Sequence, residues 1–494
     1  TEQKDEPMPQ RIYNVLGREK QDFQPLEEGK VGIYVCGPTV YDYPHIGHAK
    51  NYTAFDVVVR YLRYSGLDVL YVQNITDVGH LLDTEEDRIL KKARQTQSRP
   101  MQVVETYTKA YFDAMDALGL NRPDISPRAS GHIPEQIKLI ETLIRKKHAY
   151  VSEGSVYFDV MTDPDYGKLS NRRVGAQEAG ARVEVRGEKR NPEDFALWKR
   201  ADPEHILRWD SPWGEGFPGW HIECSAMAKK YLGATFDIHG GGIDNIFPHN
   251  ESEIAQSECA NDVDFARYWM LVGSLLVPDE YGNPVKMSKS LGNFVTLADA
   301  LKKYRPEAIR MFMLGVHYSN PITYEDGAID GTERGWERIY NAVRLTRRAM
   351  NTALAGSSEG NAILDVVKQT RADFAAAMDD DFTTPLAIAS LQDLTREVNT
   401  LLNSGVNVGL DVVNAIHDAY TDLGGKVLGI VPETEAAAAG DGAREGALIE
   451  LLIKMRAEAR VNKNWAESDR IRNELAKVGV TLEDRSDGTI WKTT

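Results

Sequence analysis

The chain has 494 residues, several times the length of a typical single domain, so we expect two to four domains. Hydrophobic residues make up 42% of it and charged residues 27%, a globular composition that excludes disordered and membrane-spanning classes. The formal charge of −16, taken alone, favours a small-molecule substrate over a polyanionic partner. Three cysteines exclude a disulfide scaffold. With neither a signal-like segment nor a run of about 18 apolar residues, we expect a cytoplasmic protein with no membrane contact.

The first structured stretch has the pattern of a strand, a helix and a second strand. The apolar run 31–35 predicts a strand that ends at Cys36. Apolar residues at helical spacing predict a helix over about 49–64, and residues 69–72 predict the next strand. This order indicates a parallel sheet. Ligands of such sheets bind at the carboxyl ends of the strands, where Cys36 and the loop that follows it lie.

The pattern changes further along the chain. Residues 85–150 have a helical composition, whereas 150–210 contain short strands and turns that we interpret as an insertion into the sheet domain. The α/β pattern resumes with a strand at 236–238 and a helix from about Pro248 to Ala260.

The chain from residue 295 onward combines a helical region with two stretches of small residues. Residues 295–350 are helical in pattern and rich in Arg and Lys. The stretches 355–360 and 433–446 predict two linkers that bracket a helical domain and leave a C-terminal module of about fifty residues.

Two histidines, His45 and His48, stand at the predicted start of the first helix, separated by Ile46 and Gly47. The backbone N–H groups and the helix dipole favour an anion at that end, and the glycine allows close approach of a phosphate or a base. Two histidines near a turn are more often incidental, so this pattern alone leaves both interpretations open.

Lys286 and Lys289 lie three residues apart in a loop rich in Ser and Gly. Two such lysines can hold a polyphosphate as mobile point charges. For an arbitrary pair of lysines a solvated loop is the better interpretation. The occurrence of this motif after the histidine motif, in this order, favours the phosphate site.

Four further side chains make a plausible zinc set with mixed ligands. His249 and Glu253 lie one turn apart on a predicted helix, so both can face one ion. Cys36 ends the first strand, and Cys224 precedes the pair. The ligands are scattered and a lone cysteine is usually core, so spacing alone is weak support. We interpret the third cysteine, Cys259, as core.

Taken together, these residues resemble the cysteinyl-tRNA synthetase family of class I aminoacyl-tRNA synthetases. The HIGH and KMSKS motifs of that class stand unaltered at 45–48 and 286–290. Further similar stretches run through the chain: Tyr34–Asp42, Asn74–Asp77, Asp194–Lys199, Gly219–Ser225, Asp237–Asp244, Trp465–Asp469, Leu482–Asp484 and Asp487–Trp491.

The resemblance implies an α/β fold, in which a Rossmann-like parallel-sheet catalytic domain with an insertion precedes a helical bundle and a small C-terminal α/β module. The boundaries it implies are 21–148 and 211–270 for the two halves of the catalytic domain, 149–210 for the connective insertion, 271–330 for the KMSKS and stem-contact region, 331–432 for the bundle and 446–494 for the anticodon-binding module.

The resemblance also implies the reaction and its cofactors. L-cysteine would react with ATP, accompanied by Mg²⁺, to give cysteinyl-adenylate and pyrophosphate, and cysteine would then pass to tRNA(Cys). One Zn²⁺ per chain, on Cys36, Cys224, His249 and Glu253, would bind the substrate thiolate. A soft thiolate suits zinc far better than a hydroxyl, so serine is rejected at the binding step. A monomer is the expected state.

Roles for individual residues follow from the same resemblance. His45 and His48 would contact ATP, and Lys289, helped by Lys286, would neutralise the departing pyrophosphate. The residues expected to receive the adenosine are Gly241, Gly242 and Asp244. Those expected to line the cysteine pocket are Gly37, Thr39, Thr76 and Trp220.

The sequence departs from the family pattern at two places. Asn250 and Ser252 replace residues of the usual FPHHENE stretch, although both inferred ligands there survive. Upstream of KMSKS the common His-x-Gly is replaced by Leu271-Val-Gly273, and a longer turn spans 278–284. The first change should leave metal binding intact, whereas the second affects the expected nucleotide contacts and loop motion rather than the reaction.

Three rival functions differ in acceptor or in activity. One relative joins cysteine to an amino sugar with the same chemistry, but it lacks the C-terminal module that residues 446–494 resemble. A zinc-stabilised nucleic-acid-binding protein would not need intact HIGH and KMSKS motifs. A generic nucleotidyltransferase would leave the four dispersed zinc ligands unexplained.

Local charge weakens the argument from net charge against a nucleic-acid partner. Residues 286–348 hold eleven basic and seven acidic side chains, and residues 445–494 hold nine of each. Contacts with phosphate need cations at the contact itself and do not require a protein that is basic overall. We therefore expect modest, salt-dependent affinity for tRNA.

Overall fold

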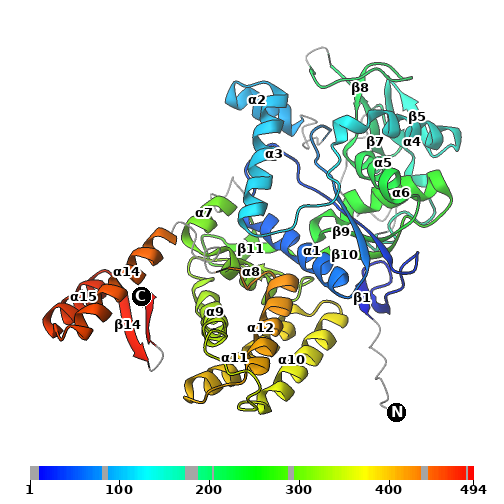
Figure 1. Ribbon diagram of the computed structural model, residues 1–494. Helices are drawn as coiled ribbons and strands as arrows, with labels where there is room; N and C mark the ends of the chain where they lie inside the picture. Colours follow the sequence, from blue (N-terminus) through cyan, green and yellow to red (C-terminus); the bar gives the residue numbers. More distant parts are fainter. Residues whose placement is uncertain are drawn as a thin grey trace, which may run out of the picture.

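The computed structural model describes residues 10–79, 87–172, 187–202, 205–287, 294–434, 443–485 and 488–493. Figure 1 shows a sheet domain joined to a helical bundle, with a small C-terminal module beside the bundle. Among the described residues, no helix is both long enough and apolar enough to cross a membrane.

A four-stranded parallel sheet lies at the centre of the larger domain. Its order is β10 (Ala266–Val272), β9 (Phe236–Gly242), β3 (Lys30–Val35) and β4 (Asp68–Gln73), and all neighbouring strands are parallel. The inner strands are buried on both faces, which explains why β3 reads as a continuous apolar run. The predicted parallel α/β sheet is confirmed, and its carboxyl ends meet at one edge.

Helix α1 (Ile46–Tyr64) joins β3 to β4 and packs on β9. It begins earlier than the sequence predicted, because His45 forms its N-cap. A Cβ atom on Gly240 would lie 2.3 Å from the ring of Phe55. The glycine at that position of β9 therefore allows α1 to approach the sheet closely.

Helices α5 (Trp220–Leu232) and α6 (Glu251–Asn261) pack on each other, and α5 contacts β3. The helix predicted from Pro248 begins instead at Glu251. The preceding residues form a short turn, η3 (Ile243–Asn245), and a π-helical turn, η4 (Ile246–Asn250), which contains extended backbone at Phe247. His249 consequently lies in the turn and not in the regular helix.

The insertion contains η2 (Val160–Thr162) and an antiparallel sheet, and α4 (Ile133–Arg145) precedes it. The strands of this sheet, in order, are β5 (Ala149–Ser152), β6 (Ser155–Phe158), β7 (Phe195–Arg200) and β8 (Gly216–Pro218). Trp198 of β7 pairs with Pro218 of β8, so the sheet continues past residue 210, where the sequence placed the end of the insertion.

Further helices flank these two sheets. The helical residues predicted at 85–150 form α2 (Arg88–Thr96), α3 (Pro100–Ala117) and η1 (Ala129–His132) in addition to α4. At the N-terminus, β1 (Arg11–Asn14) and β2 (Glu19–Asp22) form a hairpin that packs on β10.

A smaller sheet follows β10. Strand β11 (Leu275–Pro278) pairs with β12 (Pro284–Lys286) in a hairpin, and β13 (Ile322–Thr323) runs parallel to β11. Two helices, α7 (Leu297–Lys303) and α8 (Pro306–Leu314), separate the hairpin from β13. Helix α1 packs against β11, α7 and α8.

The helical bundle consists of α9 (Asp330–Ala349), α10 (Ala362–Asp379), α11 (Thr384–Asn403), α12 (Leu410–Ala419) and the π-helical η5 (Tyr420–Val427). Helix α9 packs on α11 and α12. Residues 355–360, predicted as a linker in front of this bundle, instead connect two of its helices. Leu354 and Gly409 form a backbone bridge across that connection.

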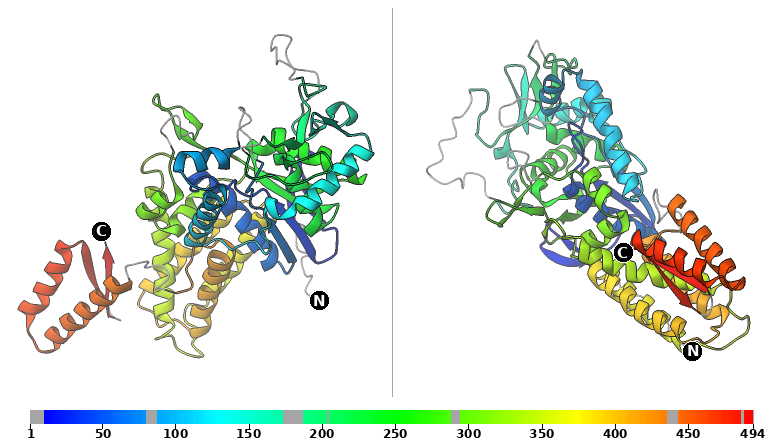
Figure 2. Two further views of the ribbon diagram at one scale, coloured as in Figure 1. Left: turned by 90° about the horizontal axis from the view of Figure 1, so that it is seen from above. Right: turned by 90° about the vertical axis from the view of Figure 1, so that its left-hand side faces the viewer.

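The C-terminal module consists of α14 (Ala443–Val461), α15 (Trp465–Lys477) and the hairpin β14 (Val480–Arg485)–β15 (Gly488–Thr493). It has its own small core, formed by Ile449, Ile453, Ile471, Leu475 and Val480. Figures 1 and 2 show the module beside the bundle and away from the sheet domain. A hydrogen bond of 2.8 Å from Arg485 Nη1 to Asn403 Oδ1 joins the module to α11.

Candidate active site and metal centre

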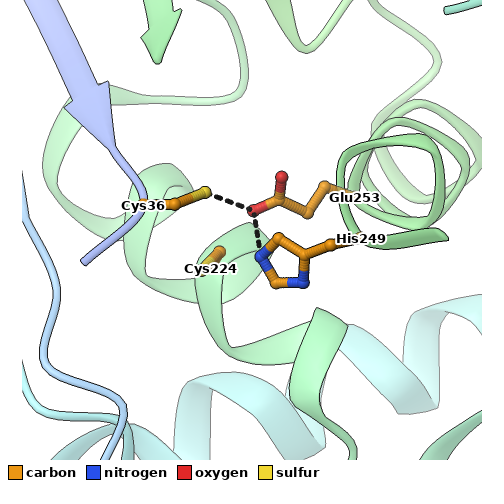
Figure 3. Close-up of side chains that lie close together, drawn as sticks. All are labelled: Cys36, Cys224, His249 and Glu253. Carbon is orange, nitrogen blue, oxygen red and sulfur yellow. Dashed lines mark hydrogen bonds and ion pairs between the residues drawn. The ribbon is translucent and has the colours of Figure 1, made fainter. Parts of the chain in front are cut away.

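The four predicted metal ligands meet at the carboxyl edge of the parallel sheet. Cys36 follows β3, Cys224 lies on α5, His249 lies in the turn before α6, and Glu253 lies in the first turn of α6. One ligand atom from each of the four lies within 4.8 Å of the others, and all four residues are buried. Figure 3 shows their side chains converging from these separate elements.

Glu253 is held between the ligand set and two further residues. Its Oε1 faces His249 Nε2 at 3.6 Å and Cys36 Sγ at 3.9 Å. Its Oε2 accepts a hydrogen bond of 2.8 Å from Asn250 Nδ2 and lies 3.1 Å from His239 Nε2. Oε1 thus faces the other proposed ligands, while Oε2 is held in place by Asn250 and His239.

The chemistry of this donor set fits a zinc ion. The hydrogen bond shared with Cys36 and the burial of both thiols raise the pKa of Cys224 well above its usual range. Burial alone would raise the pKa of Glu253, but His239 and His249 outweigh it and lower that pKa to about 2. Two thiols, an imidazole and a carboxylate in one buried cluster are donors of the kinds that Zn²⁺ takes in proteins. No rival arrangement of His, Cys, Asp and Glu is found among the described residues.

Of the residues expected to line a cysteine pocket, Trp220 and Gly37 adjoin this cluster. Trp220, the first residue of α5, stacks on His249 with ring centroids 4.3 Å apart. Thr39 and Thr76 form a parallel backbone bridge. Gly37 donates its N–H to Asn74 Oδ1 at 2.8 Å, and a Cβ atom at Gly37 would overlap the carbonyl of Asn74. Only glycine fits there.

The two HIGH histidines cap α1 with their own rings. Gly47 N–H donates to His45 Nδ1 at 3.1 Å, and His45 N–H donates to His48 Nδ1 at the same distance. Because both Nδ1 atoms accept from the backbone, the proton of each neutral ring must sit on Nε2. Both histidines therefore present an Nε2–H donor.

The same two rings are neutral at physiological pH. Burial and the nearby Lys286 cation lower the pKa of His45 to about 4. Burial and His45 lower the pKa of His48 well below its usual range. At the start of α1 the pair therefore offers directed hydrogen bonds and the positive end of the helix dipole rather than two imidazolium charges.

The residues expected to receive adenosine form the end of β9 and the turn after it. A Cβ atom on Gly241 would lie 3.6 Å from Cys36 Cβ, whereas one on Gly242 would meet no atom within 4 Å. Asp244 forms an ion pair of 3.0 Å with Lys286, the last residue of β12. Lys289 lies outside the described residues.

The segment that follows KMSKS lies against the start of α1. Ile46 N–H donates to Val295 O at 3.1 Å, and Leu297 N–H donates to Pro44 O at 2.9 Å. The ring of Phe294 packs edge-on against His45 at 5.4 Å. The two motifs, distant in sequence, therefore border one site.

Sequence reasoning missed three residues of this region. Asn74 and His239 lie within stretches quoted for the family resemblance, but nothing in their spacing indicated a contact. Lys50 is buried on α1, where a lysine on a helix is normally read as a solvated residue. Of the three cysteines, Cys259 packs partly buried against the core of the insertion, as expected.

The two departures from the family pattern have different outcomes. Asn250 takes part in the metal centre through its contact with Glu253. Leu271 is buried in β10 and pairs in register with Gly241.

Comparisons of the sequence with known families identify three matched regions. Residues 22–334 match the family described as tRNA synthetases class I (C) catalytic domain. Residues 373–432 match the DALR domain, and residues 446–491 match the Cysteinyl-tRNA ligase anticodon binding domain.

Individual relatives match along the whole chain. The cysteine–tRNA ligase of Deinococcus radiodurans is 50% identical, and the match covers 97% of this chain and 96% of the relative. The cysteine–tRNA ligase of Chlorobium luteolum is 48% identical, with 99% and 100% covered. A cysteine–tRNA ligase of Thermus thermophilus is 46% identical, with 97% and 98% covered.

Solved structures of other class I enzymes share the fold. Mycobacterium tuberculosis methionyl-tRNA synthetase, in complex with methionyl-adenylate, aligns with a TM-score of 0.57 at 14% identity over 86% of this chain and 94% of its own. A leucyl-tRNA synthetase of Agrobacterium radiobacter aligns with a TM-score of 0.60 at 13% identity over 84% and 86%. Together with the sequence relatives, these matches place the chain in the cysteine–tRNA ligase family of class I aminoacyl-tRNA synthetases.

Proposed function

We propose that this enzyme activates L-cysteine with ATP to give cysteinyl-adenylate and pyrophosphate, and then transfers cysteine to the 3′ end of tRNA(Cys). The observation that carries the proposal is the buried cluster of Cys36, Cys224, His249 and Glu253 beside the start of the HIGH helix. A thiol-selective centre and a phosphate-binding helix terminus at one sheet edge meet the needs of this reaction.

One Zn²⁺ per chain, held by those four residues, would supply a soft Lewis-acidic centre that prefers a thiolate to a hydroxyl. The remaining recognition is by the protein itself. Trp220 stacks on His249 and forms one wall of the cysteine pocket, while Gly37, Thr39 and Thr76 form the other. Glu253 is kept in place by Asn250 and His239.

ATP would bind across the two motifs with Mg²⁺ on its phosphates. The Nε2–H groups of His45 and His48 donate to the α-phosphate region as negative charge grows there. Lys286 and Lys289 neutralise the departing pyrophosphate, and Gly241, Gly242 and Asp244 receive the adenosine. Because each group binds or orients without forming a covalent bond, the rate comes from positioning and charge stabilisation.

The domain boundaries expected from the sequence carry over to this proposal, except that the insertion extends to Pro218. The region around 271–330 contacts the acceptor stem, and residues 446–494 read the anticodon. The enzyme acts as a monomer in the cytoplasm.

Binding of tRNA is expected to fall steeply with salt, since it rests on local cations in an acidic protein. Charging of a tRNA(Cys) transcript, measured at low and at high salt, tests this directly. Cysteine activation without any charging of the transcript would favour the amino-sugar acceptor instead.

The experiment that tests the function is pyrophosphate exchange into ATP, with cysteine and serine compared and zinc content measured alongside. We expect exchange with cysteine, essentially none with serine, and one zinc per chain. The absence of exchange with cysteine would contradict the proposal, and so would equal exchange rates with cysteine and serine. In the same assay, Lys289→Ala should lower the exchange rate and leave the KM for cysteine unchanged.

A further inference from the structure

Lys50 is a buried cation that the proposed reaction does not use. It lies on α1, just beyond the HIGH motif, and only 2% of its surface is exposed. Its Nζ donates to the carbonyl of Gly273 at 2.6 Å and to the carbonyl of Asn320. No carboxylate of the described residues pairs with it, and burial lowers its pKa to about 8. A buried lysine that binds only carbonyls is unusual, because burial penalises its charge and no opposite charge offsets the penalty.

The two carbonyls belong to segments that are tied closely together. Gly273 N–H donates to Tyr318 O at 2.9 Å, and Ile322 N–H donates to Ser274 O at 3.1 Å. A Cβ atom on Gly273 would lie 2.5 Å from Ser319 O. Residues 273–276 and 318–324 thus run side by side, and Lys50 clamps both to α1.

The clamped segment leads directly into the hairpin that carries the first KMSKS lysine. Leu275 begins β11, and its Cβ lies 4.0 Å from where a Cβ on Gly47 of the HIGH motif would be. The next residue, Leu276, is paired with Lys286 across the β11–β12 ladder. The anchor at Gly273 therefore lies three residues from the backbone pair that places Lys286.

We propose that Lys50 is a positioning residue for cysteine activation, which holds the base of the β11–β12 hairpin against the HIGH helix and so sets Lys286 relative to His45. The inference rests on the proposed function and deepens it. Lys50 touches neither cysteine nor the metal ligands. Its loss should therefore affect the step in which the two motifs cooperate on ATP and leave cysteine binding intact.

The surroundings of Lys50 make the assignment specific. The small cavity beside Lys50 is lined mostly by apolar side chains (Ala54, Val57, Val272 and Met313 among them), and Tyr318 is the other titratable side chain in this lining. The Tyr318 hydroxyl is committed to a hydrogen bond of 2.8 Å with Asp381, which also contacts His317 at 3.4 Å. Within the described part of the chain, the two carbonyls are therefore the partners on which the Lys50 ammonium depends.

The test compares Lys50→Met with Arg60→Met in the full-length, zinc-loaded protein. Arg60 lies on the same helix and pairs with Asp56 and with Gly119 O, away from the hairpin. We expect Lys50→Met to lower kcat of pyrophosphate exchange by about tenfold or more, since small displacements of positioned groups are costly. The KM for cysteine and the zinc content should stay within about twofold, and Arg60→Met should keep the wild-type kcat.

Hydrogen–deuterium exchange supplies a second readout that is independent of activity. Amides of residues 275–286 should exchange faster in Lys50→Met and not in Arg60→Met. Lys50→Arg keeps donors for both carbonyls and should recover most of kcat. Should Lys50→Met not fold, Lys50→Leu replaces it, because its side chain is apolar and has no donor for the two carbonyls.

A wild-type kcat in Lys50→Met or Lys50→Leu would overturn the inference, as would an equal loss in Arg60→Met, which would reveal a purely structural role. The proposed function fails separately, by absence of cysteine-dependent exchange in the wild-type protein. In that case the local deuterium exchange of the hairpin still reports on the clamp.

Discussion

The ammonium of Lys286 lies 3.0 Å from the carboxylate of Asp244, so a KMSKS lysine is paired with a residue expected to receive adenosine. Both side chains are well exposed, and an exposed ion pair is weak, typically about 0–1 kcal/mol. The pair can therefore open easily. We therefore expect Lys286 to leave Asp244 when ATP offers a stronger partner in its phosphates.

Replacing Asp244 should affect ATP and not cysteine. We expect Asp244→Asn to raise the KM for ATP severalfold, because the amide is a weaker acceptor for the ribose and no longer orients Lys286. The KM for cysteine should be unchanged. Steady-state pyrophosphate exchange measures both constants, with Glu280→Gln, an exposed carboxylate in the turn of the same hairpin, as the control. An unchanged KM for ATP would exclude Asp244 from the nucleotide site.

Removing one metal ligand should abolish zinc binding and cysteine activation together. Cys36→Ser and His249→Ala each remove one of the four donors that converge in the buried cluster, and we expect the loss of a thiolate or an imidazole donor to lower zinc affinity steeply. Cys259→Ser is the matched control, since that thiol packs against the insertion core and not in the cluster. Zinc content by atomic absorption and exchange rates would be measured on the same preparations. Retained zinc with normal cysteine affinity in either ligand variant would refute the assignment.

Asn250 should strengthen zinc binding without being a ligand. Its amide donates to Glu253 Oε2 at 2.8 Å and also lies 3.8 Å from Cys36 Sγ. Loss of such an outer partner typically lowers metal affinity by about 10–100-fold, so we expect Asn250→Ala to fall in that range. Competition with a chromophoric chelator measures the affinity. Asn261→Ala, at the far end of α6, should bind zinc like the wild type. Equal zinc affinities in Asn250→Ala and Asn261→Ala would show that Asn250 contributes to packing and not to zinc binding.

His45 should remain neutral throughout the physiological pH range. Its folded-state pKa of about 4 lies below the 6.5 of an ordinary histidine. Its contribution to the free energy of unfolding is therefore complete above pH 6.5 and is lost as the pH falls toward 4. In a histidine-labelled sample, the His45 Cε1 resonance, assigned by its loss in His45→Gln, should not shift between pH 6 and 8. A titration midpoint near 6.5 would contradict the buried, backbone-capped ring.

The sequence predicted those parts of the site that lie at the ends of single elements. Cys36 ends an apolar strand and His45 begins an amphipathic helix, so local pattern alone puts both at the carboxyl edge of a parallel sheet. The ligand set needed the family resemblance, because Cys36 and Cys224 are far apart in sequence and their distance depends on how α5 packs against β3.

Contacts that depend on register or on chain reversal could not be predicted. His239 reaches Glu253 only because β9 and α6 pack in one particular alignment. In the sequence, Lys50 has the pattern of an ordinary surface lysine, because its carbonyl partner Asn320 lies 270 positions later in the chain. The pairing of Trp198 with Pro218, which carries the antiparallel sheet past residue 210, depends on long-range contact in the same way.

The central claim is that the buried cluster selects cysteine by binding its thiolate, and substitution of the zinc with Co²⁺ tests it most directly. Cobalt reports its ligands optically, because each thiolate adds a charge-transfer band in the near ultraviolet. With Cys36 and Cys224 already bound, we predict that L-cysteine increases this band and that L-serine leaves it unchanged. An identical spectrum with cysteine and with no amino acid, at cysteine concentrations that saturate pyrophosphate exchange, would contradict the claim.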